Sequence, residues 1–207
     1  MSEKIIFDSV SFYYEKDYPI LNNFSYVFDS EDCVAITGPS GSGKTSLLHL
    51  LSGWIYPVSG QIIYSRPAQS GENFRYVFSA PYLIAELNAL DNIFLDRPMS
   101  PVNLEKCHSL AEAFQVKHLL SYWPSQLSSG QQQRVSIIRA LMSDAPFFLA
   151  DEPTAHLDPH RAYSLMQEVM VVLRKQKQGL ICVTHDPQLH TLFDRQLDMS
   201  QLEDNIH

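Results

Sequence analysis

The stretch CVAITGPSGSGKTSLLHLLSG, residues 33–53, joins three kinds of local sequence. Its first part, Cys33–Thr37, is a short apolar run of the kind that forms a strand buried on both faces of a sheet. The glycine-rich loop Gly38–Gly43 comes next, and Lys44–Gly53 then carries leucines at helical spacing. A strand, a glycine loop and a helix in this order predict the opening of an α/β fold.

The loop has the pattern G-x4-G-K-[ST], which ends at Lys44 and Thr45. Its glycines let successive backbone N–H groups converge on one concavity, and the N-terminus of the following helix adds partial positive charge. Lys44 would bring a full charge to the β- and γ-phosphates of a nucleotide, and the Thr45 hydroxyl can ligate Mg²⁺. A glycine–serine turn without a ligand is the alternative, but the strand and helix on either side favour nucleotide binding. The predicted phosphate-binding residues are Gly38, Pro39, Ser40, Gly41, Ser42, Gly43, Lys44, Thr45 and Ser46.

The composition is that of a globular protein and excludes several other classes. The chain has 207 residues, of which 45% are hydrophobic and 18% charged, so it can bury a sizeable core. Its formal net charge of −8 gives no general attraction for nucleic acid or anionic lipid. No apolar stretch approaches the roughly 18 to 20 residues that cross a bilayer. The three cysteines are widely spaced, which excludes a CxxC-type zinc site and fits a reducing cytosol.

A second buried strand, Phe147–Ala150, is followed directly by Asp151 and Glu152. Sheets of α/β proteins bind ligands at the C-terminal ends of their strands, and neighbouring strand residues point to opposite sides. We therefore expect Asp151 to join the Mg²⁺ site and Glu152 to act as a base on a water molecule. Two solvated acids at an ordinary strand end are the alternative, which the phosphate loop elsewhere in the chain makes less favourable.

Further strand and helix patterns fill the rest of the chain. Lys4–Phe12 and Leu21–Phe28 alternate in the way typical of half-exposed antiparallel strands. From about residue 88 to 144 the apolar spacing is helical, and another helix is expected to begin at the cap Asp158 and to end at Gly179. Shorter strands are predicted at Gln61–Tyr64, Arg75–Phe78 and Leu180–Thr184. Together these elements predict an α/β core interrupted by a helical insertion.

A third motif reads LSSGQ and comprises Leu127, Ser128, Ser129, Gly130 and Gln131. With this motif and the two before it, the chain resembles the nucleotide-binding domain of ABC transporters, whose signature motif is LSGGQ. Residues 155–158 and 183–186 also match the family's order, so that the resemblance covers nearly the whole chain.

The resemblance implies a P-loop NTPase core with a mixed sheet, N-terminal antiparallel strands and a helical insertion that carries the signature motif. It also implies that residues 1–207 form a single ABC ATPase domain. Within that domain, about 1–85 and 145–207 would be the ATP-binding core, and about 86–144 the helical subdomain.

Individual residues acquire roles from the same resemblance. Tyr14 would stack on adenine, with Tyr13 as a possible substitute. The signature serine and nearby backbone N–H groups would approach a γ-phosphate held by another subunit, so two chains would face head to tail around two ATP molecules. His185 would contact the γ-phosphate and position the attacking water. Asp158 would communicate across the dimer and could also cap its helix.

Two positions depart from the family's pattern. Ser129 stands in the family's Gly-Gly pair, where a side chain would crowd the phosphate or restrict the backbone. Ser79 stands where the family has a glutamine that joins the metal and water shell. Because serine is shorter, it would need an added water to span the same distance. We therefore expect a slower or differently gated catalytic step, with loss of hydrolysis as the alternative.

These observations predict a cytoplasmic ATP-hydrolysing subunit of an ABC transporter, attached peripherally to the inner face of the membrane through separate permease subunits. It would bind ATP and Mg²⁺, form a homodimer or a dimer with another ABC subunit in the ATP-bound state, and bind no nucleic acid. The segment Ser79–Asn92 is apolar enough to receive a helix of the permease, with packing inside the helical insertion as the alternative.

Other functions are weighed against this one. An ATP-gated dimerising module with weak or no hydrolysis is the main alternative, because of Ser79 and Ser129. The single phosphate loop and the acidic balance disfavour a soluble ABC ATPase acting on DNA or ribosomes. The signature motif and the Asp-Glu pair disfavour a small-molecule kinase.

Overall fold

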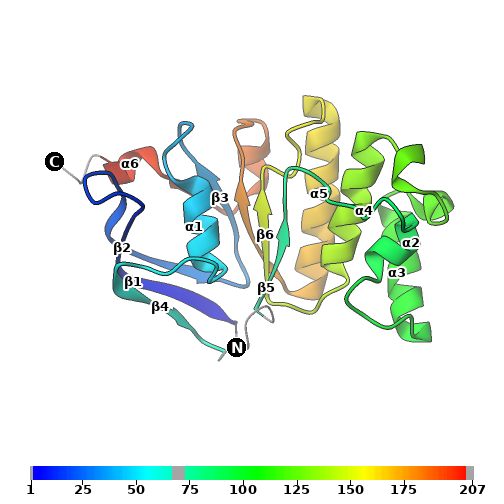
Figure 1. Cartoon of the computed structure of the whole chain (residues 1–207), viewed down its shortest axis with the longest axis horizontal. Coiled ribbons are helices and arrows are strands. Elements are labelled where there is room, and N and C mark those ends of the chain that lie inside the picture. Colours follow the sequence, from blue (N-terminus) through cyan, green and yellow to red (C-terminus); the bar gives the residue numbers. More distant parts are fainter. Residues whose placement is uncertain (1, 67–72, 204–207) are drawn as a thin grey trace.

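Helix α1, Lys44–Leu51, lies between two β-sheets (Figure 1). The computed structural model describes residues 2–66 and 73–203. All four leucines of α1 are fully buried and pack with side chains of both sheets in one core cluster. The predicted strand, loop and helix are therefore present, and the helix ends at Leu51, two residues before the expected Gly53.

One sheet is parallel, with the strand order β5-β6-β7-β3-β8. Its strands are β5 (Phe74–Val77), β6 (Phe147–Asp151), β7 (Gly179–Val183), β3 (Cys33–Thr37) and β8 (Arg195–Asp198). In β3, Ile36 packs with α1, whereas Ala35 belongs to a second core cluster on the other face of the sheet. Burial on both faces explains why the inner strands are continuous apolar runs.

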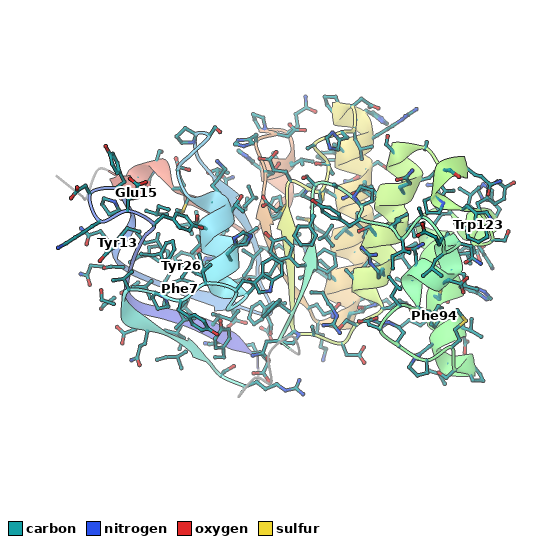
Figure 2. All side chains as sticks on the ribbon, in the orientation of Figure 1. Phe7, Tyr13, Glu15, Tyr26, Phe94 and Trp123 are labelled. Atoms are coloured by element: carbon teal, nitrogen blue, oxygen red, sulfur yellow. The ribbon has the colours of Figure 1, made fainter. Side chains whose placement is uncertain are left out.

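The other sheet is antiparallel, with the strand order β2-β1-β4. Its strands are β1 (Lys4–Tyr13), β2 (Pro19–Asp29) and β4 (Ser59–Tyr64). Phe7, which is labelled in Figure 2, lies in β1 below α1. Its ring meets those of Phe24 and Phe28 of β2 edge-on, with centroids 5.6 and 5.9 Å apart. These rings share a core cluster with the leucines of α1. The predicted α/β class, with parallel and N-terminal antiparallel strands, is confirmed.

Helices lie on the side of the parallel sheet away from α1 (Figure 1). Of these, α4 (Ser129–Leu141) and α5 (Pro159–Gln176) contact the sheet, whereas α2 (Ala89–Ile93) and α3 (Pro101–Ala113) pack on the outer side of α4. The short helix α6 (Ser200–Glu203) follows β8. In each of α2 to α5, the side chain before the first helical residue accepts a hydrogen bond from a backbone N–H of the first turn. Asp158 is the cap of α5, as predicted. Single turns of 3₁₀ helix occur at Lys117–Leu119, Pro124–Gln126 and Leu189–Leu192.

The end of α5 differs from the sequence-based expectation. The helix ends at Gln176, where Lys177 turns the chain with a left-handed φ of 57°, and Gly179 already begins β7. A Cβ atom at Gly179 would lie 2.9 Å from the carbonyl oxygen of Asp29 and the Cα of Ser30. The glycine therefore allows close approach of another backbone segment, and the prediction that it terminates the helix is wrong.

Replacing Leu50 by alanine should lower the free energy of unfolding by about 2–5 kcal/mol, because it leaves a cavity between the two sheets. Urea denaturation followed by circular dichroism measures the change. Val171, whose side chain on α5 is 69% exposed, supplies the matched control. Val171→Ala should stay within about 0.5 kcal/mol of wild type, and an equally small effect of Leu50→Ala would contradict the enclosure of α1.

Candidate nucleotide-binding site

The phosphate loop connects the end of β3 to the first residue of α1. Gly41 and Gly43 both have φ of 86°, a left-handed conformation that favours glycine. A Cβ atom at Gly43 would overlap the side chain of Ile20 in β2. Both the backbone conformation and the close packing therefore require glycine at residue 43.

Lys44 is the charged group of this loop and is only 6% exposed. Its Nζ atom donates to the carbonyl oxygens of Gly38 at 3.0 Å and Pro39 at 2.6 Å. The hydroxyl of Ser42 is also buried, and it has no hydrogen-bond partner among the described residues. An ammonium group and an unpaired hydroxyl at the N-terminus of a helix fit the binding of phosphate oxygens.

The predicted metal residues meet beside the loop. The Thr45 hydroxyl donates to Oδ2 of Asp151, the last residue of β6, at 3.0 Å. The Tyr76 hydroxyl of β5 lies 3.4 Å from the same oxygen. Mg²⁺ prefers oxygen ligands, and proteins commonly supply only one or two of them while substrate phosphates and waters complete the shell. Thr45 and Asp151 fit this pattern, and no group of three or more His, Cys, Asp or Glu residues in 2–66 and 73–203 could hold a metal ion.

The second carboxylate points to a different partner. Glu152 lies outside β6 and has a left-handed φ of 48°, a strained conformation for a residue with a side chain. Its Oε1 atom lies 2.7 Å from Nε2 of His185, which follows β7. The sequence predicted that alternation along a strand would point the Asp151 and Glu152 side chains in different directions. The side chains do diverge, but the cause is the left-handed turn at Glu152 after the strand has ended. The two predicted catalytic residues are thus in direct contact.

Tyr14 lies next to the phosphate loop, and its side chain is largely exposed to solvent. The Ser46 hydroxyl donates to the Tyr14 hydroxyl at 3.4 Å, and the Tyr14 ring is 65% exposed. Phe12 supports that ring edge-on at a centroid distance of 5.0 Å. Tyr13 is half-buried in β1. An exposed ring beside the loop suits stacking on a base better than a half-buried one, which favours Tyr14 over Tyr13.

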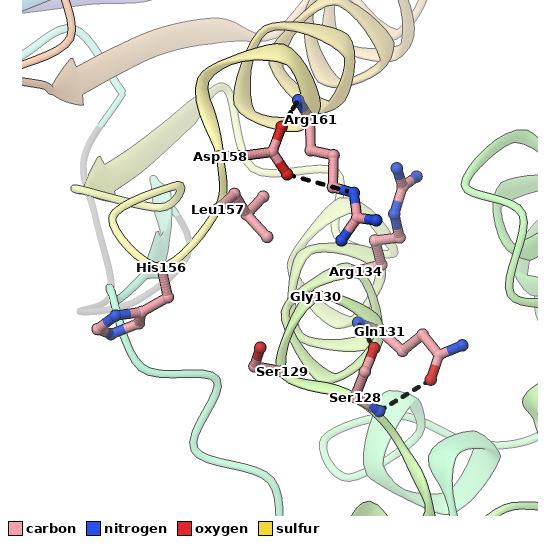
Figure 3. Close-up of a pocket in the computed structure, with 9 residues that line it drawn as sticks. All are labelled: Ser128, Ser129, Gly130, Gln131, Arg134, His156, Leu157, Asp158 and Arg161. Carbon is pink, nitrogen blue, oxygen red and sulfur yellow. Dashed lines mark hydrogen bonds and ion pairs between the residues drawn. The ribbon is translucent and has the colours of Figure 1, made fainter.

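The signature motif forms the N-terminus of α4 (Figure 3). Ser128 is the cap, and its hydroxyl accepts from the Gln131 backbone N–H at 3.3 Å. The Gln131 side chain accepts in return from the Ser128 backbone N–H at 2.8 Å, which completes a capping box. Ser129 is the first helical residue and is exposed. Ser128, and not Ser129, is therefore the cap of this helix.

A pocket of about 410 Å³ separates the start of α4 from the start of α5 (Figure 3). The residues around it are Ser128, Ser129, Gly130, Gln131, Arg134, His156, Leu157, Asp158 and Arg161. The structure thus brings the signature motif and Asp158 together, while the phosphate loop contributes nothing to this pocket. From the sequence, Arg134 and His156 stand in or beside matched motifs without a predicted role, and Arg161 was not predicted at all. The Asp158–Arg161 ion pair, with 3.3 Å between the Oδ2 and Nε atoms, has a helical i, i+3 spacing that could have indicated it.

Ser79 follows β5 in a loop that is attached to α4. Gln133 of α4 donates to the carbonyl oxygen of Phe78 at 3.0 Å. Arg139 of α4 donates to the carbonyl oxygens of Pro81 at 3.0 Å and Tyr82 at 3.1 Å. The Ser79 hydroxyl itself makes no hydrogen bond within the described part of the chain. Neither Gln133 nor Arg139 was singled out from the sequence.

Comparison with known proteins shows the family to which the chain belongs. A family model described as ABC transporter matches residues 21–155. The chain belongs to the ABC transporter family. It is 33% identical over 198 residues to the lipoprotein-releasing system ATP-binding protein LolD of Hydrogenovibrio crunogenus, and the match covers 88% of this chain and 86% of that protein. The predicted ATPase subunit of an ABC transporter is confirmed, and the alternative of a binding module is not favoured.

Solved structures of ABC proteins have the same fold. The cbiO1 protein from Clostridium perfringens, part of the cbiONQ transporter complex, superposes with a TM-score of 0.83 at 22% identity, over 94% of this chain and 83% of that one. A bacterial Atm1-family ABC exporter with ATP bound gives a TM-score of 0.79 at 24% identity, over 96% of this chain and 37% of that one. At these identities the likeness concerns the fold of the ABC ATPase subunit.

Lys44→Ala should weaken ATP binding at least about tenfold while the fold is retained, because it removes a charge-assisted contact worth roughly 1.5–3 kcal/mol. Titration with a fluorescent ATP analogue measures the affinity. Lys117→Ala is the matched control, since Lys117 pairs with Glu112 on the surface of the helical part. Equal affinity of Lys44→Ala and wild type would show that this loop does not bind the phosphates.

Proposed function

We propose that this ABC subunit hydrolyses Mg·ATP and passes the resulting movement to separate permease subunits. The observation that carries the proposal is the division of labour between two adjacent carboxylates. Asp151 contacts Thr45 at the phosphate loop, whereas Glu152 contacts His185 on the other side of the strand end. This separation provides one acid for the metal and one for a water molecule.

The chemistry follows from the positions of these groups. Lys44, at the start of α1, neutralises charge on the β- and γ-phosphates, which stabilises the transition state of phosphoryl transfer. Glu152 accepts a proton from the attacking water. His185 contacts the Glu152 carboxylate and orients this carboxylate and the water toward the γ-phosphate. Mg²⁺ held by Thr45 and Asp151 would supply further neutralisation of the phosphate charge.

Dimerisation is proposed because the two halves of the site lie apart in one chain. The phosphate loop adjoins α1, while the signature motif begins α4 on the opposite side of the parallel sheet (Figure 1). Two chains facing head to tail would place the signature pocket of one against the phosphate loop of the other. Such an arrangement has two-fold symmetry and generates two equivalent nucleotide sites in a homodimer. Pairing with another ABC subunit uses the same surfaces.

Attachment to the membrane is proposed to be peripheral, at the inner face. In the described part of the chain, no helix combines the length and the apolar character that crossing a bilayer requires. The loop after Ser79 exposes Tyr82 and Ile84, which are 66% and 42% accessible, to a permease helix. In this proposal about 86–144 moves as the helical subdomain against a core of about 1–85 and 145–207. The net charge of −8 supports the absence of a nucleic-acid partner.

Glu152→Gln keeps the shape of the side chain but removes the base. Steady-state ATP hydrolysis should fall by about 10²- to 10⁴-fold, while ATP binding persists and traps a dimer. Phosphate release and size-exclusion chromatography with ATP give the two readouts. Glu112→Gln, at a surface carboxylate paired with Lys117, is the control and should behave as wild type. Normal turnover together with a monomer in ATP would remove Glu152 from this role.

Ser79→Gln tests how the serine replaces the family's glutamine. If a bridging water fills the gap, the longer amide should order the same region directly, saving up to about 2 kcal/mol of immobilisation cost. Basal ATP hydrolysis should then rise, by at most about thirtyfold. Nucleotide affinity should change little, because Lys44 and the loop backbone dominate it.

Phosphate release at saturating Mg·ATP is the measurement, with Ser79→Ala as the matched variant. Alanine cannot hold a bridging water, so its rate should lie below wild type. A flat or lower rate for Ser79→Gln would mean that the neighbouring loop is shaped around serine, and the bridging-water explanation would be wrong.

A further inference from the structure

We propose that Tyr76 is a positioning residue for the metal side of the site. Its hydroxyl donates to Oδ2 of Asp151 and holds that carboxylate toward Thr45. The inference rests on the proposed function, because it deepens the role of the same site.

The pairing of two strands places Tyr76 on the correct face. β5 and β6 are parallel neighbours, and Tyr76 stands opposite Leu149 in the register. Leu149 belongs to the core cluster around α1, and Tyr76 packs against that same cluster. Asp151 comes two residues after Leu149 and therefore points to the same face. The Tyr76 hydroxyl and the Asp151 carboxylate thus extend toward the start of α1 from adjacent strands.

Aromatic neighbours restrict the tyrosine ring. The Trp54 ring stacks on it with 4.7 Å between centroids and 24° between planes. Phe78 packs against it at 4.5 Å, and Trp54 also stacks on Phe78 at 5.9 Å. Aromatic pairs of this kind are favourable beyond the area that they bury. A ring enclosed in this way presents its hydroxyl in one direction.

The Tyr76 hydroxyl acts as a donor in this contact. A tyrosine hydroxyl carries its proton at neutral pH and donates to the Asp151 carboxylate, which accepts. Since Thr45 would turn its oxygen toward a metal ion, Tyr76 provides a second contact that keeps the carboxylate in place. Outer contacts of this kind commonly alter metal affinity by about 10- to 100-fold.

Ser79, in the loop after β5, makes no direct contact of the kind that Tyr76 makes with Asp151. It lies three residues after Tyr76, and its hydroxyl has no hydrogen-bond partner within residues 2–66 and 73–203. Tyr76, by contrast, contacts a predicted metal residue directly. The direct polar contact to the metal side of the site therefore comes from Tyr76, and Ser79 would reach that side only through the bridging water tested above.

Tyr76→Phe tests the proposal, because it keeps the stacked ring and removes only the hydroxyl. Mn²⁺ is the probe, and its binding is followed by electron paramagnetic resonance in the presence of a non-hydrolysable ATP analogue. We expect Mn²⁺ to bind about tenfold more weakly than to wild type, the lower end of the usual range because the contact is 3.4 Å long. The affinity for the analogue in EDTA should be unchanged.

Tyr64→Phe is the matched control. Tyr64, like Tyr76, is partly buried and packs against the core cluster around α1, but its hydroxyl donates to the carbonyl oxygen of Leu51 at 3.0 Å, at the opposite end of α1 from Thr45. This variant should bind Mn²⁺ as wild type does, and its thermal unfolding shows how much stability the loss of a partly buried hydroxyl removes. The control thus separates a structural effect of a missing hydroxyl from an effect on the metal.

The outcomes distinguish the two levels of inference. Unchanged Mn²⁺ affinity in Tyr76→Phe overturns the role of Tyr76 and leaves the proposed function intact. Equal losses of Mn²⁺ and of metal-free analogue binding, or equal effects in Tyr64→Phe, show a structural role only and also overturn it. A wild-type chain that binds no Mn²⁺ with nucleotide overturns the proposed function and this inference together.

Discussion

The enclosure of α1 between two sheets is the constraint on which the site depends. The helix cannot shift without exposing leucines that both sheets cover. Because Lys44 is its first residue, the packing that buries these leucines also fixes the ammonium group and the Thr45 hydroxyl. Ile20 of the antiparallel sheet closes over Gly43 and leaves no space for a side chain. The packing of α1 and of Ile20 in the core therefore fixes the conformation of the phosphate loop.

The end of strand β6 places two neighbouring carboxylates, Asp151 and Glu152, in different surroundings. Asp151 continues the face of β6 that packs on α1, so its carboxylate reaches the helix start. One residue later, the left-handed turn at Glu152 redirects the chain and brings the next carboxylate to His185. A single backbone torsion thus gives two neighbouring acids different surroundings. The strain of that torsion is retained because β6 precedes Glu152 directly and the Glu152 backbone N–H donates to the carbonyl oxygen of Val183, the last residue of β7, at 3.0 Å.

Much of this could be predicted because the signals are local. The inner strands are apolar on both faces, the phosphate loop is contiguous, and the cap at Asp158 acts within one helical turn. The features that escaped prediction depend on distant parts of the chain. Gly179 has the form of a helix terminator, yet its role is set by the turn between β2 and β3. In β8 only Leu197 is buried, so there is no pattern to detect. The contact of Tyr76 with Asp151 follows from strand pairing, which spacing along one strand does not reveal.

Helix α4 joins two regions that are far apart in the sequence. Its first turn carries the signature motif, while the side chains of Gln133 and Arg139 donate hydrogen bonds to three carbonyl oxygens of the loop after β5. With 13 residues, the helix is about 20 Å long. Gln133, two residues after the motif, and Arg139, near the other end of the helix, both attach the loop to α4. A displacement of the loop would therefore move α4 as one unit, and the signature motif would travel with it.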